Sequence, residues 1–295
     1  MHLGQRHDCL PAAEVTLNPQ QVRALLQTHG LTPSRALGQN FVSDANTVRR
    51  IARLAGVGPG YRVLEIGPGL GSLTLALCET GASLTAVEAD RHLIPVLEEV
   101  LAGSGVTVVH ADAMHLDWSA LLGDRPGWVL VANLPYNVAT PLVADILDGV
   151  AVIDRMLVMV QREAGERLCA PVGDPAYGAV SVKVAYWASA SVVGRVPASV
   201  FHPRPRVESV LVDIRRRPAP AVDPLTVPPA ELFSLVRAGF ATRRKMLRRA
   251  LAGLVGPAEF EAAGVSPESR AENLDVAAWG RLAGARLAGA AGVRR

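Results

Sequence analysis

Four consecutive residues, Asn133, Leu134, Pro135 and Tyr136, combine groups that could hold a flat, amine-bearing base. The Asn133 side chain and a backbone carbonyl offer hydrogen-bond acceptors, the proline fixes the backbone, and the tyrosine offers an aromatic face. The stretch follows an apolar run at residues 128–132, which is typical of a buried strand. Open α/β sheets bind ligands where their parallel strands end, so we interpret this tetrapeptide as part of a binding site.

A second stretch, residues 63–71, has the pattern of a strand that enters a glycine-rich turn and then a helix. Glycines such as Gly67 and Gly69 allow the backbone to approach a ligand closely. Glu88 follows about 20 residues later, at the end of the next apolar run, where a carboxylate can accept hydrogen bonds from both ribose hydroxyls. The turn alone would also fit a plain connection, but the turn and the carboxylate together predict an adenosine-containing cofactor.

The residues around the turn distinguish between adenosine cofactors. Ser72 occupies the place of the last glycine in the dinucleotide-binding pattern. Glu65 would bring a negative charge near the turn, which disfavours a pyrophosphate and favours a cationic or zwitterionic ligand. S-adenosylmethionine has both characters. Asp112, at the end of the third apolar run, is placed to accept a hydrogen bond from the adenine amino group of the cofactor, although an aspartate there would also suit an ordinary turn.

Alternating strand and helix patterns position these residues. Helical stretches at 73–78, 93–101 and 141–147 separate five apolar runs, at residues 62–66, 83–87, 106–110, 128–132 and 156–160. This spacing predicts an α/β fold with a doubly wound, mostly parallel sheet. Two further runs, at 191–196 and 207–214, are predicted to form an antiparallel hairpin at the edge of that sheet.

The chain also shows signs of division into domains. We expect a lead segment at residues 1–33, with a helix that begins after Asn18 and is closed by Gly30. A second helix is expected to follow it, capped by Ser43 or Asp44 and ended by Gly56. The proline-rich stretch 217–229 is predicted to be a linker, so the large domain would span 34–217. Helical patterns at 231–239, 243–254 and 276–288 then predict a small helical domain within 218–295.

Composition narrows the class of protein. The 295 residues are 49% hydrophobic and 4% aromatic, as in an ordinary α/β or α-rich globular protein, and the net charge is +3. The three cysteines, Cys9, Cys78 and Cys169, are far apart, which suggests neither a disulfide framework nor a zinc site and fits a reducing compartment. The scattered histidines, His110, His115 and His202, suggest no metal site either. The chain contains no run of roughly 20 apolar residues, so we expect a cytoplasmic protein without membrane attachment.

Six motifs occur in an order that resembles the ribosomal RNA adenine dimethylases, and within that family the small-subunit dimethyladenosine transferase type, from about Arg35 to Trp279. They are residues 38–42 (Gly-Gln-Asn-Phe-Val), 65–71 (Glu-Ile-Gly-Pro-Gly-Leu-Gly), 133–137 (Asn-Leu-Pro-Tyr-Asn), 160–163 (Val-Gln-Arg-Glu), 201–207 (Phe-His-Pro-Arg-Pro-Arg-Val) and 271–275 (Ala-Glu-Asn-Leu-Asp). The lead segment is longer than the family needs, and Ala36-Leu37 replaces a more basic or aromatic approach to Gly38. We assign no function to either difference.

The resemblance implies a Rossmann-like class I methyltransferase sheet with a small C-terminal helical domain. It also implies N6-dimethylation, with S-adenosylmethionine, of two adjacent adenosines in the 3′-terminal hairpin loop of small-subunit (16S) rRNA. The partner would be the small ribosomal subunit or its assembly intermediate, and the enzyme would be a monomer. By the same resemblance the cofactor would be held by Asn40, Val42, Gly67, Glu88, Asp112 and Asn133.

The residues of the tetrapeptide suggest how an adenine amine would react. Its lone pair is delocalised into the ring, so acceptors must orient the amine toward the methyl donor. The Asn133 oxygen and the Leu134 carbonyl would take the two N–H groups, so that displacement is direct and needs no metal. Tyr136 would stack on the target base, which must leave its helix or loop. By resemblance, Phe201 would cover the other face of the base.

Clustered arginines suggest contacts with the phosphates of RNA. Arg204 and Arg206 lie beside the proposed target pocket in sequence, and a second cluster is predicted to open a helix of the small domain: Arg243, Arg244, Lys245, Arg248 and Arg249. A solvated basic face is the plain alternative. A broad basic platform would suit structured RNA, which proteins recognise largely by shape.

Three alternatives stay open on the sequence alone. Large-subunit (23S) rRNA adenine methyltransferases, which confer macrolide-type resistance, share the fold and most site residues, but residues 243–245 and 271–275 resemble the small-subunit type. A non-catalytic nucleic-acid-binding relative is disfavoured by the intact Glu88, Asp112 and Asn133. A dehydrogenase is disfavoured by Ser72 and by the lack of a placed acid or base for hydride transfer.

Overall fold

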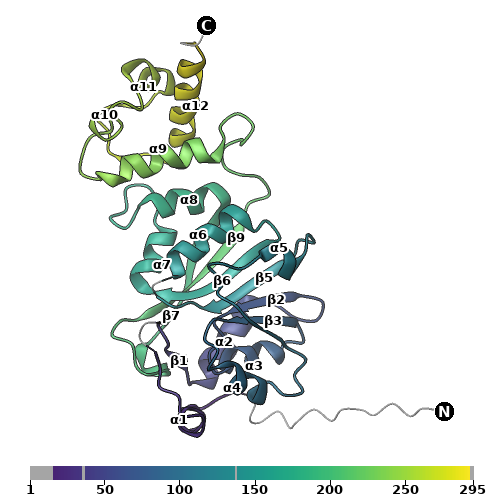
Figure 1. Ribbon diagram of the computed structural model, residues 1–295. Coiled ribbons are helices and arrows are strands. Elements are labelled where there is room, and N and C mark those ends of the chain that lie inside the picture. The colour runs from purple at the N-terminus through teal and green to yellow at the C-terminus, as the bar shows by residue number, and fades with distance from the viewer. Residues whose placement is uncertain (1–15, 35–36, 137, 293–295) are drawn as a thin grey trace, which may run out of the picture.

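The structure, a computed structural model, describes residues 16–34, 37–136 and 138–292. Within these residues a seven-stranded sheet carries helices on both faces, and a group of helices lies at one end (Figure 1). The strands are β2 (Arg62–Ile66), β3 (Ser83–Glu88), β4 (Thr107–His110), β5 (Trp128–Asn133), β6 (Ile153–Gln161), β7 (Ala188–Val196) and β9 (Ser209–Arg216). Their order is β4-β3-β2-β5-β6-β9-β7, with β2 to β6 parallel. The predicted doubly wound sheet is therefore confirmed.

Alternate residues of the central strands point to opposite faces of the sheet. In β5, Leu130 and Ala132 pack in one core cluster, whereas Val129 and Val131 pack in another. The first cluster lies under α5 (Trp118–Leu122), α6 (Ala139–Gly149), α7 (Arg162–Cys169) and α8 (Ala179–Trp187), and the second lies under α2 (Ala45–Ala55) and α3 (Ser72–Cys78). Both faces of β5 are thus buried, which is why its sequence is a continuous apolar run.

The segment before the sheet wraps around one end of it. Helix α1 (Pro19–Thr28) has the predicted Asn18 cap, and it packs through Val22 and Leu26 in a cluster that includes Val96 of α4 (Ile94–Val100). The short strand β1 (Phe41–Val42) pairs with β8 (Phe201–His202), which follows the single turn η1 (Ala198–Val200). Of the two predicted caps of helix α2, Asp44 is the one that forms, and the helix ends as predicted at Gly56 in the left-handed conformation.

The predicted hairpin forms, but its position in the sheet is corrected. Strands β7 and β9 pair antiparallel, and β9 lies between β6 and β7, so only β7 is at the edge. The reason is burial: residues 209–214 of β9 are all buried, and an inner strand needs a partner on each side. Helices α7 and α8, which the sequence pattern did not predict, connect β6 to β7.

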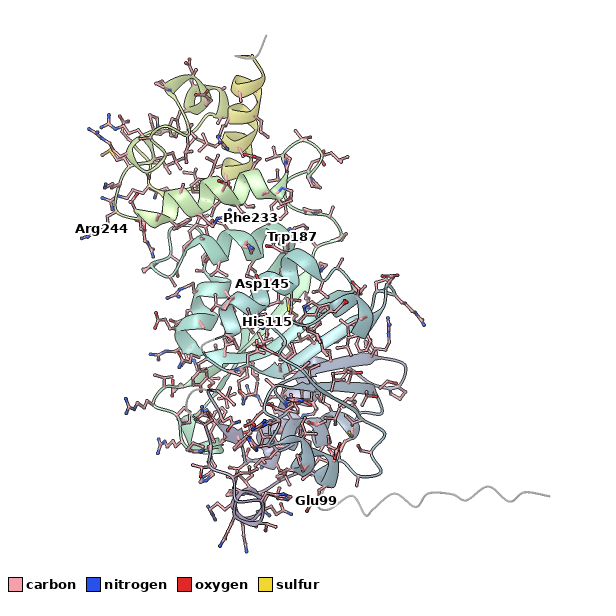
Figure 2. All side chains as sticks on the ribbon, viewed as in Figure 1. Glu99, His115, Asp145, Trp187, Phe233 and Arg244 are labelled. Atoms are coloured by element: carbon pink, nitrogen blue, oxygen red, sulfur yellow. The ribbon has the colours of Figure 1, made fainter. Side chains whose placement is uncertain are left out.

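A group of helices follows residues 217–228, which contain no helix or strand. The group comprises α9 (Pro229–Ala241), α10 (Leu247–Ala250), α11 (Pro257–Ala263), η2 (Ala271–Asn273) and α12 (Val276–Gly292). Their core includes residues of α8, and Figure 2 shows Trp187 and Phe233 close to each other between α8 and α9. The Tyr186 ring makes edge contacts with both, at centroid distances of 4.7 Å and 5.2 Å. The two parts of the molecule therefore share a packed aromatic contact.

The helix predicted at residues 243–254 is wrong, because only α10 is helical there. The backbone N–H groups of Leu247 and Arg248 donate to the carbonyls of Ser269 and Pro267, and Met246 forms a β-bridge with Arg270. These contacts hold the segment before α10 against the chain near η2. If helix α9 continued through residues 243–248, these residues could not make those contacts.

In the part of the chain that the structure describes, no helix is long and apolar enough to cross a membrane. Cys78 and Cys169 are free thiols, and burial raises the pKa of each to about 11. Cys9 lies outside the described residues. So do Arg35, Ala36 and Asn137, which border or belong to the predicted motifs.

Candidate active site

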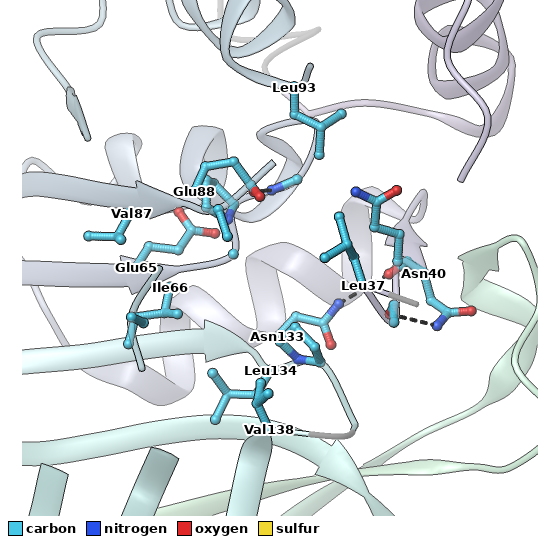
Figure 3. A pocket seen from close by; sticks show the side chains of 18 of the residues that line it. Leu37, Asn40, Glu65, Ile66, Val87, Glu88, Leu93, Asn133, Leu134 and Val138 are labelled. Carbon is cyan, nitrogen blue, oxygen red and sulfur yellow. Dashed lines mark hydrogen bonds between the residues drawn. The ribbon is translucent and has the colours of Figure 1, made fainter. Parts of the chain in front are cut away.

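A cavity of about 330 Å³ opens at the C-terminal ends of β2, β3 and β5 (Figure 3). This volume lies at the lower end of the range for small-molecule sites. Residues predicted to bind the cofactor or the target base line it together: Asn40, Val42, Glu65, Gly67, Gly69, Glu88, Asp112, Asn133, Leu134, Pro135 and Tyr136. The fold therefore collects into one cavity side chains that are spread over about a hundred positions of the sequence.

The turn after β2 strongly favours glycine. Gly67 and Gly69 have φ angles of 68° and 61°, a region that other residues rarely adopt. A Cβ atom on Gly69 would also lie 2.9 Å from Cδ1 of Phe41. The Phe41 ring thus packs directly against the turn at Gly69, and both residues line the cavity.

Glu88 is fixed at the end of β3 by the backbone around it. Its Oε2 accepts the N–H of Gly69 at 3.1 Å and its Oε1 accepts the N–H of Asp90 at 2.9 Å. Burial raises the pKa of this carboxyl, and the two N–H donors oppose that rise in part. A carboxylate oxygen can accept more than one hydrogen bond, so Glu88 keeps capacity for a ligand hydroxyl at the cavity.

Glu65, which was expected to be an anion near the turn, is fully buried and lines the cavity. Burial raises its pKa to about 8, with the Glu88 charge adding to the rise and the nearby Thr74 hydroxyl opposing it. Among the described residues no hydrogen-bond partner is found for Glu65 Oε2, Ser72 Oγ or Thr74 Oγ1. Glu65 and Ser72 also line the cavity, where their oxygens suit a cationic amine that would stabilise the ionised form of Glu65.

Asp112 lies at the exposed rim after β4. Its Oδ1 accepts the N–H of Met114 at 2.9 Å, and its Oδ2 lies 3.0 Å from Nδ1 of His115. The Met114 donor and then the His115 contact hold the pKa of the Asp112 carboxyl below its ordinary value. It is therefore an anion at neutral pH. His115 is exposed, and the sequence pattern gave it no role beside Asp112.

The tetrapeptide that begins at the last residue of β5 is held by backbone hydrogen bonds and by Asn40, the residue before β1. The Asn133 Nδ2 donates to the carbonyl of Asn40 at 3.2 Å, which leaves its side-chain oxygen as the acceptor for a target amine (Figure 3). The Leu134 N–H donates to Met159 at 3.0 Å, and the Pro135 carbonyl accepts from the first turn of α6. The acceptor end of Asn133 is therefore oriented before any ligand binds.

Tyr136 presents its ring to the cavity with its hydroxyl anchored behind. The hydroxyl lies 3.1 Å from Oγ of Ser209, which is fully buried at the start of β9. Burial raises the pKa of Tyr136, so it stays neutral. A ring tethered at its far end is a fixed surface against which a base can stack.

Phe201 does not line the cavity, in contrast to its predicted place over the target base. It is buried, it pairs with Val42 across the β1–β8 ladder, and it packs in the core under α2 and α3. Val42, which lies directly opposite Phe201 in the ladder, belongs to the same core cluster and also lines the cavity. In this arrangement Phe201 supports the cavity wall.

Other lining residues were not singled out from the sequence, among them Leu37, Gln39, Leu93 and Met114. Gln39 stands inside the motif at residues 38–42, and that was the only signal available for it. Its partner lies 51 positions away, so local pattern could not reveal the contact.

The predicted RNA-binding arginines divide into two kinds. Arg243 is tied down, because its Nε donates to Glu272 at 2.7 Å and its Nη2 donates to the Pro175 carbonyl at 2.7 Å. The others are at least partly exposed: Arg204, Arg206, Arg244, Lys245, Arg248 and Arg249. Figure 2 shows Arg244 extending into solvent, and Figure 1 shows the α9–α10 turn and the chain after β8 on one side of the molecule.

Several known proteins are similar to this chain over nearly its whole length. The family model described as ribosomal RNA adenine dimethylase matches residues 31–285. The ribosomal RNA small subunit methyltransferase A of Kineococcus radiotolerans is 49% identical, over 93% of each chain, and that of Streptomyces avermitilis is 45% identical, over 92% of this chain and 95% of the relative.

Two solved structures have a similar fold. A dimethyladenosine transferase from Plasmodium falciparum is 22% identical, with a TM-score of 0.68 over 82% of this chain and 95% of the other. The 23S rRNA methyltransferase ErmE is 25% identical, with a TM-score of 0.66 over 83% and 99%. These matches confirm the predicted fold, enzyme class and cofactor, and the chain belongs to the ribosomal RNA adenine dimethylase family.

Proposed function

We propose that the protein transfers methyl groups from S-adenosylmethionine to N6 of two adjacent adenosines in the 3′-terminal hairpin loop of small-subunit (16S) rRNA. One observation carries the proposal: Glu88, Asp112, Asn133 and Tyr136 all line a single cavity of about 330 Å³. Glu88 and Asp112 suit the adenosine of the cofactor, whereas Asn133 and Tyr136 suit the adenine of the target.

The residues of the cavity fit S-adenosylmethionine group by group. Glu88 would accept hydrogen bonds from the ribose hydroxyls, and Asp112 would accept one from the adenine amine. Oε2 of Glu65, for which the described residues offer no hydrogen-bond partner, would face the amino group of the cofactor, and Gly67 and Gly69 allow the backbone to approach it. Asn40 and Val42 form the opposite wall. When bound, the cofactor supplies an electrophilic methyl group.

Asn133 would prepare the target amine for attack. Its amide nitrogen is occupied by the Asn40 carbonyl, so its oxygen is the end that accepts an N6 proton. The Leu134 carbonyl would accept the second, and the lone pair would then point toward the methyl group. Fixed acceptors of this kind are worth about 3 kcal/mol of barrier. After one transfer a single N–H remains, and a neutral amide can still accept it, which permits the second methylation.

Tyr136 would hold the flipped base by stacking. Base–aromatic stacking contributes about 1–3 kcal/mol, and it requires that the adenine leave its neighbours in the RNA. The hydrogen bond between the Tyr136 hydroxyl and Ser209 fixes the tilt of the ring. We assign Phe201 to the support of Val42, because it is buried behind the wall.

Exposed arginines would bind the RNA backbone. Arg204 and Arg206 lie just after β8, and a second group on the α9–α10 turn and α10 consists of Arg244, Lys245, Arg248 and Arg249. Arg243 would hold the segment that carries this group in place, because it donates to Glu272 and to the Pro175 carbonyl. The domain division at residue 217 is part of the proposal: the large domain would carry the chemistry and the small one would carry RNA contacts.

The small subunit is favoured over the large subunit by the names of the relatives. Proteins at 45–49% identity over nearly the whole chain are named ribosomal RNA small subunit methyltransferase A, whereas the large-subunit enzyme ErmE shares 25% identity. We further propose that the enzyme acts as a monomer in the cytoplasm, on the small subunit or an assembly intermediate of it.

Transfer of label from S-adenosylmethionine would test the proposal. The protein is incubated with methyl-labelled cofactor and with undermethylated small or large ribosomal subunits, and the label is then mapped on the rRNA. We expect label on N6 of two adjacent adenosines near the 3′ end of small-subunit rRNA. Label confined to large-subunit rRNA would overturn the choice of subunit, and label in neither would overturn the activity.

A further inference from the structure

A hydrogen bond joins two walls of the cavity that are distant in sequence. The side-chain nitrogen of Gln39 donates to Oδ2 of Asp90 at 2.7 Å, and the side-chain oxygen of Gln39 accepts the N–H of Ser34 at 2.7 Å. Both Gln39 and Asp90 are half-buried. Because one partner is a carboxylate, the bond between them belongs to the stronger, charge-assisted class.

On one side, this bond leads to the carboxylate that faces the ribose. Asp90 donates its backbone N–H to Oε1 of Glu88, and its own Oδ1 accepts the N–H of His92 at 3.0 Å. Asp90 is thus fixed at three points, and it fixes Glu88 in turn. A displacement of Asp90 would shift the donor that orients the Glu88 oxygen.

On the other side, the bond leads to the acceptor for the target amine. Gln39 is followed by Asn40, whose carbonyl accepts the Asn133 amide at 3.2 Å. A chain of hydrogen bonds and one peptide unit therefore runs from Glu88 through Asp90, Gln39 and Asn40 to Asn133. Glu88, Gln39, Asn40 and Asn133 of this chain line the cavity, and Asp90 links Glu88 to Gln39 from outside the lining.

We propose that Gln39 is a positioning residue that holds the wall at residues 38–42 at the correct distance from Glu88. This inference deepens the proposed function and rests on it. Gln39 acts through Asp90 and Asn40, and it sets the width of the cofactor cavity and the orientation of Asn133. Its loss would weaken cofactor binding more than it weakens folding.

The fold explains why folding would survive the loss. The lead segment is attached to α4 by the apolar cluster of Val22, Leu26, Leu93 and Val96, and His29 contacts Glu99 at 2.9 Å. β1 is attached separately, through its pairing with β8. None of these contacts uses Gln39, so the segment stays docked while its local geometry loosens.

An exchange of chemical groups between the two positions gives a sharp test. Gln39→Glu places a carboxylate against Asp90 and abolishes the hydrogen bond. In the double variant Gln39→Glu, Asp90→Asn the carboxylate and the amide change places. The amide at position 90 can then donate to the carboxylate at position 39, and the N–H groups of Ser34 and His92 keep their acceptors. Gln27→Glu is the matched control, because it makes the same chemical change at an exposed position of α1. Gln39→Met is a neutral variant that removes the same bond.

The readout is the Kd for S-adenosylmethionine by calorimetry without RNA, together with KM for each substrate. We expect Q39E to raise the Kd and the cofactor KM by about ten-fold, a typical coupling between neighbouring groups, while the KM for rRNA is unchanged. The double variant should return to within about three-fold of the wild type. Q39M should weaken cofactor binding also, and it supplies the test if Q39E does not fold. Q27E should bind like the wild type.

Two results would overturn the inference. One is cofactor affinity in Q39E or Q39M equal to that of the wild type, and the other is a double variant no tighter than Q39E. Either result leaves the proposed function intact, since the wild type still binds. Failure of the wild type itself to bind S-adenosylmethionine would overturn the proposed function, and this inference with it.

Discussion

The buried Glu65 allows a prediction about how stability and cofactor binding oppose each other. Its pKa is about 8 in the folded protein against an ordinary value of 4.5, because burial disfavours the charged form. Between these two values the folded protein holds a proton that the unfolded chain has released. The free energy of unfolding therefore falls as pH rises through this window, by about 1.4 kcal/mol per pH unit from this group.

Glu65→Gln removes that dependence with little change in size. Relative to the wild type, the variant should gain about 3 kcal/mol of stability between pH 5.5 and pH 8, and the gain should level off above pH 8. The amide nitrogen introduced by this substitution could donate to Thr74 Oγ1 or Ser72 Oγ, which have no partner among the described residues. The variant should thus be the more stable protein at neutral and alkaline pH.

Cofactor binding should change in the opposite direction. If a cationic amine sits against Glu65, binding ionises the carboxyl, and the affinity of the wild type should rise with pH between about 6 and 7.5. The upper limit is set by the amine, which begins to lose its own proton near pH 7.7. E65Q should bind S-adenosylmethionine more weakly, and its affinity should be nearly independent of pH in this range.

Urea unfolding at several pH values and calorimetric titration with the cofactor would check both parts. Glu98→Gln, on the exposed face of α4, is the control for removal of one carboxylate. A stability difference between wild type and E65Q that is the same at pH 5.5 and pH 8, within about 1 kcal/mol, would refute the role of burial. Equal cofactor affinity in both proteins would refute the contact with the amine.

Three further predictions concern catalysis, the turn and RNA. Asn133→Ala should lower kcat by about 10²–10³, measured as methyl transfer at saturating substrates, because an amine acceptor is lost. Gly69→Ala should lower the free energy of unfolding by more than about 1–2 kcal/mol in urea, because its φ of 61° is strained and the new Cβ would meet Phe41 at 2.9 Å. Arg244→Ala and Arg248→Ala should each weaken rRNA binding and reduce the slope of log K against log salt by about 0.7–0.9.

Matched variants define what would contradict these expectations. Gly30→Ala has the same strain, at φ 62°, but no atom within 4 Å of the new Cβ, so equal losses in G30A and G69A would contradict the close approach of Phe41. Arg125→Ala removes an exposed arginine just before β5, and an equal effect there would contradict a specific RNA surface. Near wild-type turnover in N133A would contradict its role as acceptor.

The sequence by itself determined the features that depend on neighbouring residues. The cap at Asn18, the left-handed Gly56 and the glycine turn at residues 67–71 are local, since each is set by backbone preference. The strand pattern followed from burial on both faces of a parallel sheet. Because parallel strands end at one edge, the positions of Glu88, Asp112 and Asn133 at strand ends already indicated a shared cavity.

Tertiary structure alone decided the features that depend on distant partners. The contact of Gln39 with Asp90 spans 51 positions, and that of Arg243 with Glu272 spans 29, so no local pattern encodes them. Phe201 packs in the core because β8 pairs with the distant strand β1, and both Phe201 and its partner Val42 belong to one core cluster. The raised pKa of Glu65 also depends on the packed fold, since a pKa responds to the water that the surrounding chain removes.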